Sequence, residues 1–382
     1  MTLETPPSKN EFEVSIFGRG VGECVVVHLG AGQWLVVDSC INPSTKRPIA
    51  LEYFECIGVD VTTAVKRIIV THWDDDHIGG ASEILRAASL AKFVCSVTLN
   101  DRDFNTLISS HMRSAPITSA GSNISEFYEI LSLLKDRTLR NTNLTIASPI
   151  WAKSLLPLYR RESNEDVEEC VVTALSPSDQ TISRGLLGIA EQLPQSRLGA
   201  AQKRKVAVDG NETSVVLHAR LGSRVALLGA DLENQNDTRS GWQGIVNLEE
   251  SFHPSKASIF KVPHHGSDNA YCPAVWENLL ESQPTAVVTA FTKGKKPRPS
   301  PEDLQRLRSH THLLYLTTPV KGKRIHRSRT RERLTRKLIP SLKPLIGLIG
   351  HVRIRMTNSD GSNYIKTETF GPAYRVKDCE SF

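Results

Sequence analysis

The sequence of 382 residues lacks the features that mark membrane-spanning and secreted chains. No apolar run approaches the ~18 residues that a membrane-spanning helix requires. The N-terminal stretch MTLETPPSKNEFE has no basic start followed by apolar residues, so a signal peptide is not indicated. The GxSxG, P-loop and GxGxxG patterns are also missing. We therefore expect a cytoplasmic protein that does not enter the membrane and does not use these nucleophile or nucleotide-binding motifs.

Cysteine is scarce, and its spacing forms no recognisable pattern. The number of cysteines is odd and no CxxC pair occurs, which argues against a disulfide framework or a cysteine-based zinc site. We expect these residues to be reduced and mostly buried: Cys24, Cys40, Cys56, Cys95, Cys170, Cys272 and Cys379.

The positive charge of the chain is concentrated in one segment. The formal net charge is +6, but residues 321–343 hold ten Lys/Arg against one Glu and contribute +9, so the remainder carries −3. Such a run is either a solvated surface segment or a contact for the phosphates of nucleic acid. The segment contains no aromatic residue, so it does not indicate stacking on single-stranded bases.

The order of predicted elements indicates an α/β layered sandwich, because β-hairpins are mixed with helices. Apolar residues recur at helical spacing in some segments and strand-like Val/Ile runs occur in others. We expect strands within 13–38, 67–71, 93–99, 171–177, 213–221, 223–231, 258–262, 286–291, 312–318, 351–358 and 363–370, and helices near 47–58, 81–91, 104–138, 243–250, 273–281 and 299–309.

The same pass predicts the domain organisation. Residues 1–12 are expected to be flexible, and residues 13–318 to form one domain with an insertion at 180–206. The basic segment follows at 319–343. Residues 344–382 are expected to form a C-terminal hairpin that packs on the same domain.

The segment His72–Gly80, HWDDDHIGG, carries the strongest chemical signal. It follows the apolar strand RIIVT, and a strand-to-helix turn directs successive side chains into one pocket. Its imidazole and carboxylate groups suit Zn²⁺, Mn²⁺ or similar ions. The alternative is an acidic helix N-terminus, where Asp is favoured. Three Asp flanked by two His exceed what a cap needs, so we predict metal ligands at His72, Asp74, Asp76 and His77.

This pattern resembles the HxHxDH signature of the metallo-β-lactamase superfamily, followed by Gly-Gly. Asp74 stands where the signature has its second His. A carboxylate there makes the metal site harder and more anionic, which favours Mn²⁺ or Mg²⁺ relative to Zn²⁺. The resemblance implies an αββα sandwich, in which two mixed sheets are flanked by helices.

Further motifs follow in the order that the superfamily implies. Asp38 ends QWLVVDS and is expected to support the metal ligands, and Asp231 ends VALLGAD and is expected to bridge two ions. One of His264 and His265, in KVPHHGS, is expected to be the last ligand. The motifs LLGAD, KVPHHGS and GNETSVVL are most similar to the metallo-β-lactamase-like domain of the ComEC competence proteins, whose membrane channel is absent here. The third-motif His of the superfamily has no counterpart, and Asn211 is expected to lie in its neighbourhood.

The resemblance implies a metal-dependent hydrolase with one or two divalent ions, Zn²⁺ or Mn²⁺, with Mg²⁺ also compatible. Water activated by the ions would attack a phosphorus or carbonyl centre. The residues do not decide between His264 and His265; we assign His265 to the metal and His264, together with Asp76, to catalysis. The expected metal ligands are His72, Asp74, Asp76, His77, Asp231 and His265.

The substrate class is the least constrained inference, because one fold hosts many chemistries. We expect a phosphodiester of DNA or RNA, bound in part by Arg327, Arg329, Arg331 and Arg333 of the basic segment. One alternative is a small-molecule hydrolase that acts on a thioester, a lactone or a cyclic nucleotide. Another is a binding or regulatory subunit that keeps the fold without turnover.

Overall fold

The computed structural model describes residues 5–100, 122–139, 146, 148–184, 210–235, 237–250, 252–293, 296–320, 348–359 and 362–377. Nearly all of the insertion expected at 180–206 and of the basic segment at 319–343 lies outside these residues. Arg327, Arg329, Arg331 and Arg333 lie outside them as well. The domain boundaries drawn from the sequence therefore stay predictions.

The described chain forms two eight-stranded sheets. In the first sheet the spatial order is β15 (Ser362–Phe370), β14 (Gly350–Ser359), β1 (Phe12–Gly18), β2 (Glu23–Leu29), β3 (Trp34–Val37), β4 (Val65–Val70), β5 (Lys92–Ser96) and β6 (Ile150–Ala152). In the second sheet it is β16 (Tyr374–Arg375), β13 (Leu314–Leu316), β12 (Leu280–Val288), β11 (Ala257–Lys261), β10 (Arg224–Leu228), β9 (Leu217–Leu221), β8 (Cys170–Ala174) and β7 (Leu156–Arg161).

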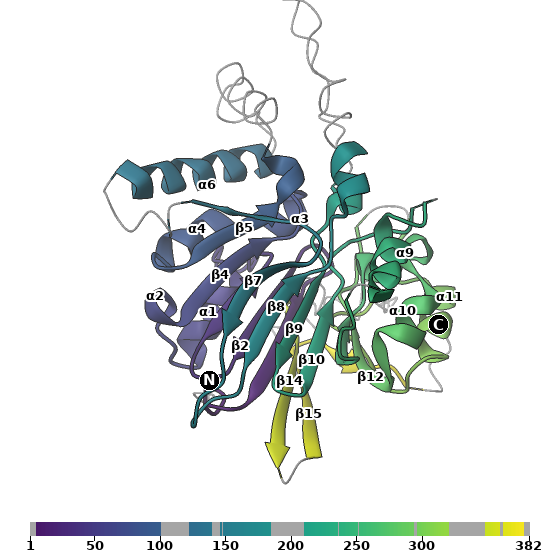
Figure 1. Ribbon diagram of the computed structural model, residues 1–382. Coiled ribbons are helices and arrows are strands. Elements are labelled where there is room, and N and C mark those ends of the chain that lie inside the picture. Colours follow the sequence, from purple (N-terminus) through teal and green to yellow (C-terminus); the bar gives the residue numbers. More distant parts are fainter. Residues whose placement is uncertain are drawn as a thin grey trace, which may run out of the picture.

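Helices lie along the outer side of each sheet, as Figure 1 shows. Those beside the first sheet are α1 (Ile49–Cys56), α2 (Val61–Ala64), α4 (Ala81–Ala87) and α6 (Ser122–Leu139), and the short α3 (Asp75–Ile78) follows β4. Those beside the second sheet are α9 (Gly241–Val246), α10 (Pro273–Asn278) and α11 (Pro301–Arg308). Short 3₁₀ turns occur at Val97–Leu99, Asn211–Thr213, Asn247–Glu250, His264–Gly266 and Asp268–Ala270.

Three apolar layers hold these elements together, and β2 shows how the sequence supplies them. Cys24 and Val26 pack under the helices of the first sheet, whereas Val25, Val27 and Leu29 pack between the two sheets. Side chains alternate between the faces of a strand, so a strand that is buried on both faces must be apolar at every position. A third layer lies between the second sheet and its helices. The result is the αββα sandwich that the resemblance implied.

Each sheet contains a run of neighbouring parallel strands, and the loops after these strands meet at one edge of the sheet. β3, β4 and β5 run parallel in the first sheet, and β10, β11 and β12 run parallel in the second. The carboxyl ends of parallel strands lie at a common edge, where the following loops meet. The loops after β3, β4, β10 and β11 contain the motifs singled out in the sequence.

The C-terminal segment contributes to both sheets. β14 and β15 pair as the predicted antiparallel hairpin, and β14 also pairs with β1, with Val14 opposite Ile354. β16 then pairs with β13 in the second sheet. The strands from the two ends of the chain therefore lie side by side.

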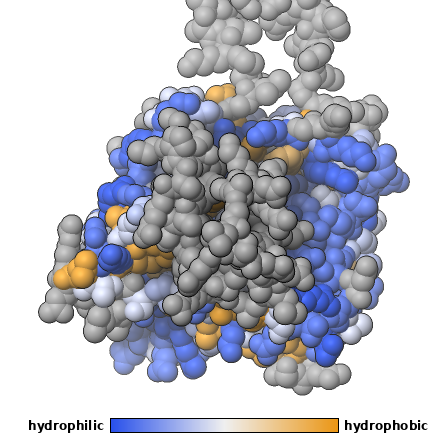
Figure 2. Space-filling model, turned by 90° about the horizontal axis from the view of Figure 1, so that it is seen from above, coloured by the Kyte–Doolittle hydropathy of each residue, from blue (hydrophilic) through white to orange (hydrophobic). Residues whose placement is uncertain are grey.

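The described cysteines are free; Cys56 is partly exposed and the other five are buried, as expected. Within the described residues, no helix has the length and apolar character needed to cross a membrane. Seen from above, the described surface is mostly hydrophilic and its hydrophobic residues form small, separate patches (Figure 2).

Candidate metal centre

The candidate site is built from loops that follow strands of both sheets. Asp38 directly follows β3, the His72–His77 segment follows β4, Asp231 follows β10, and His264 and His265 follow β11. The first two loops belong to one sheet and the last two to the other. Packing of the two sheets therefore brings together residues that are far apart in the sequence.

The turn after β4 buries its two histidines and leaves its three aspartates partly or fully exposed. Asp74 is the N-cap residue of α3, but its side chain makes no capping hydrogen bond to the helix. Its side chain is 45% exposed, and its Oδ2 lies 3.8 Å from His72 Nε2. His72 and His77 are buried. The capping alternative therefore does not account for Asp74.

Asp38 holds the ring of His77 in place. Its buried carboxylate accepts hydrogen bonds from Thr71 N–H (2.7 Å), from the Thr71 hydroxyl (2.7 Å) and from His77 Nδ1 (2.8 Å). In the neutral ring that a metal ion would bind, Nδ1 donates to Asp38 and the lone pair of Nε2 is available on the other side. The contact matches the supporting role expected for Asp38.

The Nε2 atom of His77 is central to the cluster. It lies 3.3 Å from Asp231 Oδ2 and 3.9 Å from Asp76 Oδ2. The Nε2 atom of His265 lies 3.4 Å from Asp231 Oδ2 and 3.8 Å from Asp76 Oδ2. Asp76 and Asp231 therefore both lie close to the two imidazoles.

The structure separates the two adjacent histidines. His265 points into the cluster, and its Nδ1 donates to the backbone oxygen of Thr289 (2.8 Å). His264 is partly exposed and lies beside Glu233 Oε1 (3.0 Å) and Asn211 (3.4 Å). Both have left-handed backbone conformations, with φ of 42° and 56°. Two such residues in succession turn the rings in different directions, which the sequence could not reveal.

The residues fit a divalent cation. Among the described residues, four groups of three have ligand atoms within 4.8 Å of one another. Two of them consist of predicted ligands alone: His72, His77 and Asp231, and Asp76, His77 and His265. The Nε2 atoms of His72 and His77 are buried and have no hydrogen-bond partner. Buried polar atoms normally have a hydrogen-bond partner or another ligand, so we expect a further partner for these two nitrogens. Imidazole and carboxylate donors suit Zn²⁺ or Mn²⁺.

The electrostatics of the cluster also favour positive charge. Burial alone would lower the pKa of His77, but Asp231, Asp38 and other carboxylates raise it well above its usual value. Burial opposes ionisation of Asp231, yet His265 and His77 hold its pKa well below the usual range. Burial, with the charge of His77, lowers the pKa of His72, so this imidazole is neutral and can ligate a metal.

Gly210 and Asn211, the latter expected near the place of the missing third-motif His, lie beside the cluster. A Cβ atom on Gly210 would lie 3.0 Å from Asp74 Oδ1 and 3.1 Å from the His72 ring. The amide of Asn211 donates to Glu233 Oε1 at 2.9 Å. Asn211 therefore lies next to the cluster, on the side of His264.

Sequence reasoning missed two buried charged residues, Glu23 and Lys261. Lys261 Nζ lies 2.6 Å from Glu23 Oε1, and both side chains are at most 2% exposed. Glu23 Oε1 is also 3.8 Å from His77 Nδ1. A signal was present, because each is a charged residue at one end of a strand that is otherwise mostly apolar, ECVVVHL and ASIFK. Charged residues are rarely buried without a partner.

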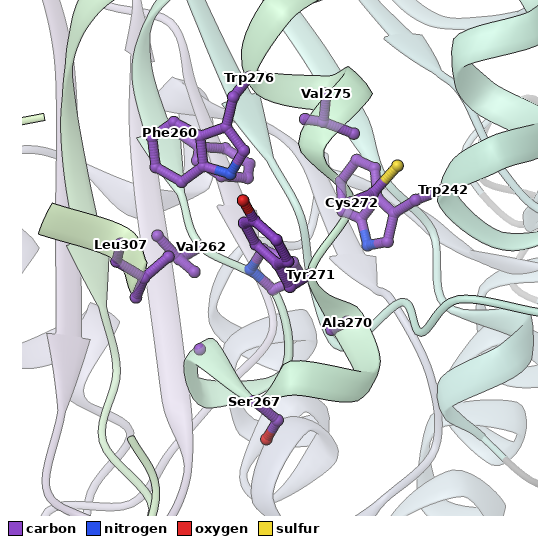
Figure 3. A pocket seen from close by; sticks show the side chains of 12 residues that line it. Trp242, Phe260, Val262, Ser267, Ala270, Tyr271, Cys272, Val275, Trp276 and Leu307 are labelled. Atoms are coloured by element: carbon purple, nitrogen blue, oxygen red, sulfur yellow. The ribbon is translucent and has the colours of Figure 1, made fainter. Parts of the chain in front are cut away.

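A separate apolar pocket lies behind the turn that carries the two histidines (Figure 3). Aromatic side chains dominate its lining, including Trp242, Phe260, Tyr271 and Trp276. Pro263, Gly266 and Ser267 of the histidine turn also line it. The pocket contains none of the cluster's ligands. We interpret it as packing that supports the turn.

Comparison with known proteins identifies the superfamily of one segment. Residues 17–103 match the sequence model of the Metallo-beta-lactamase superfamily. This segment runs from the end of β1 past β5 and includes Asp38 and the His72–Gly80 motif. None of the curated proteins compared with the chain matches it.

Solved structures with similar folds show low sequence identity. The metallo-beta-lactamase fold protein YhfI from Bacillus subtilis is 10% identical, with 81% of this chain and 98% of that chain covered and a TM-score of 0.35. The metallo-beta-lactamase SMB-1 bound to 2-mercaptoethanesulfonate is 10% identical, with 69% and 82% covered and a TM-score of 0.32. A metallo-beta-lactamase HARLDQ motif mutant from Cronobacter sakazakii is 9% identical, with 65% and 75% covered and a TM-score of 0.31.

Proposed function

We propose that this chain is a metal-dependent hydrolase that cleaves phosphodiesters of DNA or RNA. The observation that carries the hydrolase assignment is the cluster around His77. There, the buried, unpartnered Nε2 atoms of His72 and His77 meet the carboxylates of Asp76 and Asp231. The residues that would hold one or two divalent ions are His72, Asp74, Asp76, His77, Asp231 and His265.

Each side chain has a distinct task in this proposal. A bound divalent ion would supply Lewis acidity and make water a nucleophile at neutral pH. Asp38 fixes the tautomer of His77, and Asp231 lies between His77 and His265. Asp76, whose side chain is 19% exposed, is placed to accept a hydrogen bond from the attacking water. His264 lies on the more open side, beside Glu233 and Asn211, where it can contact the substrate.

Three features of the chain favour a phosphodiester as substrate. Residues 321–343 carry +9 on an otherwise mildly acidic chain, which suits the phosphates of nucleic acid. Asp74 makes the ligand set rich in carboxylates, which suits the harder ions Mn²⁺ and Mg²⁺. The motifs LLGAD, KVPHHGS and GNETSVVL resemble the ComEC-type domain. The free, mostly buried cysteines further support a reducing compartment, for which we propose the cytoplasm.

A cleavage screen tests this proposal. The purified chain would be supplied with Zn²⁺, Mn²⁺ or Mg²⁺ and given single-stranded DNA, duplex DNA, RNA or a small phosphodiester reporter. We expect metal-dependent cleavage of nucleic acid. Cleavage should be lost in Asp76→Ala and kept in the control Asp268→Ala, whose side chain is 67% exposed and outside the cluster.

The other results of the screen identify the alternatives. If only small substrates such as the reporter, a thioester or a lactone are hydrolysed, the chain is a small-molecule hydrolase. If the chain binds no metal and cleaves nothing, the regulatory alternative is correct.

A further inference from the structure

Lys261 is a buried cation directly behind the candidate metal centre. It is the last residue of β11, and its side chain is 1% exposed. Its ammonium donates to Glu23 Oε1 (2.6 Å) and to the backbone oxygen of Ala230 (2.7 Å). It also lies 3.5 Å from Asp231 Oδ1. Burial of a lysine ammonium costs desolvation free energy unless polar partners compensate its charge. These contacts therefore fix the position of the Lys261 ammonium.

The two oxygens of Asp231 face different partners because of this ammonium. Oδ1 is on the side of Lys261, at 3.5 Å. Oδ2 is on the side of the imidazoles, 3.3 Å from His77 Nε2 and 3.4 Å from His265 Nε2. A carboxylate can rotate about its last bond, and a fixed cation on one oxygen restricts that rotation. Oδ2 is thereby kept toward the cluster.

The same ammonium ties together the two turns that carry the ligands of the second sheet. The carbonyl of Ala230, the residue before Asp231, accepts from Lys261 Nζ at 2.7 Å and from His264 N–H at 3.0 Å. Ala230 has a left-handed backbone, with φ of 46°. This conformation is costly for a residue with a Cβ, so surrounding contacts must maintain it.

Glu23 is in turn held by the residue that holds His265. Its Oε2 accepts from the hydroxyl of Thr289 at 2.5 Å, and the backbone oxygen of Thr289 accepts from His265 Nδ1. Glu23 also belongs to two of the four potential ligand groups, one with Asp38 and His77 and one with Asp231 and His265. The ammonium of Lys261 already compensates the negative charge of Glu23. The two ligand groups that contain Glu23 are therefore not the ones in which we expect a metal ion.

We propose that the Glu23–Lys261 pair is a positioning device, in which Lys261 acts on Asp231 as a built-in cation. It attracts Oδ1 as an ion pair, directs Oδ2 toward the metal and keeps Glu23 out of the ligand set. This proposal rests on the proposed function only in requiring that the cluster binds a divalent ion. It assigns no contact with substrate to either residue.

The decisive variant is the charge-neutral pair Glu23→Gln with Lys261→Met. Removing Lys261 alone would also remove a positive charge that repels the ion, so its effect on affinity would mix two causes. The double substitution keeps the net charge and removes only the positioning contacts. We expect its Kd for Zn²⁺, measured by competition with a chromophoric chelator, to rise by about 10–100-fold, as is usual when groups that orient metal ligands are lost.

Lys261→Met alone gives an independent spectroscopic readout. It frees Glu23 and Asp231 Oδ1 to reach the ion, so the absorption spectrum of the Co²⁺-loaded protein should change. Thr289→Val removes only the hydrogen bond to Glu23, is nearly isosteric, and should raise the Kd severalfold even if the other variants fold poorly. The matched control is Lys256→Met, because Lys256 is an exposed lysine just before β11 that donates only to a backbone oxygen outside the cluster.

The outcomes separate this proposal from the proposed function. Wild-type protein that binds metal, together with folded variants whose Kd stays within twofold and whose Co²⁺ spectrum is unchanged, would overturn the positioning role alone. A wild-type chain with no measurable affinity for Zn²⁺, Mn²⁺ or Co²⁺ would overturn both proposals. Circular dichroism and thermal unfolding establish that each variant is folded.

Discussion

The role of Asp38 gives the sharpest test of the site, through the substitution Asp38→Asn. The amide has nearly the same shape as the carboxylate and can still accept from Thr71 N–H. Its NH₂ group, however, would face His77 Nδ1, which at present donates to Asp38 at 2.8 Å. To accept from that NH₂, the imidazole must move its proton from Nδ1 to Nε2. Nε2 would then have no lone pair to offer a metal ion.

The expected magnitude follows from the contacts. Loss of a group that orients a metal-bound histidine typically costs 10–100-fold in metal affinity, or about 1.4–2.7 kcal/mol at 1.36 kcal/mol per tenfold change. The carboxylate accepts three hydrogen bonds and the amide oxygen can replace only part of this set. We therefore expect unfolding to become easier by about 1–2 kcal/mol, which leaves the protein folded.

Two measurements check this prediction. Chelator competition gives the Kd for Zn²⁺. Two-bond ¹H–¹⁵N correlation spectra of the imidazole, recorded on the metal-free protein above the raised pKa of His77, where the ring is neutral, give its tautomer. The control is Asp60→Asn, because Asp60 caps α2 through Thr62 and Thr63 and lies outside the cluster. An Asp38→Asn protein with an unchanged Kd and the wild-type tautomer would refute the reasoning.

Three further predictions concern catalysis, binding and stability. Asp231→Ala should abolish hydrolysis in the cleavage screen while circular dichroism stays native, because Lys261 keeps Glu23 as its partner; near-normal turnover would exclude a ligand role. Replacing Arg327, Arg329, Arg331 and Arg333 by Ser should weaken nucleic-acid binding and leave cleavage of the phosphodiester reporter unchanged. The slope of log affinity against log salt should become shallower by ~0.9 per lost phosphate contact. An unchanged slope would indicate that the basic segment is a solvated surface segment. Burial lowers the pKa of His28 to about 4, and its Nε2 accepts from Gly32 N–H, so it is neutral in the folded state. The contribution of the lowered His28 pKa to the free energy of unfolding is complete above pH ~6.5 and is lost as the pH falls toward 4, by about 3 kcal/mol in total. Urea unfolding of His28→Gln across this pH range should show a correspondingly weaker pH dependence of stability than the wild type. An identical pH dependence would contradict the lowered pKa of His28.

The sequence alone determined the features that depend on neighbours along the chain. Strand alternation and helical spacing predicted most of the elements, including the β14–β15 hairpin, because the burial of each element is set by its own periodicity. The His72–His77 motif could also be read directly, since all its potential ligands lie on one turn after β4. Asp38 and Asp231 were singled out through the resemblance to the superfamily, which implies an aspartate after each of these apolar strands.

Only the tertiary structure decided which residues face one another across the two sheets. His264 and His265 are adjacent and chemically identical, and two left-handed backbone conformations direct only His265 into the cluster. Glu23 and Lys261 come from different sheets, so nothing along the chain shows that they pair behind Asp231. A motif specifies local geometry, but the partner of a buried charge depends on which strands pack face to face. Packing of the whole core determines which strands face one another, so no short segment of the sequence specifies these partners.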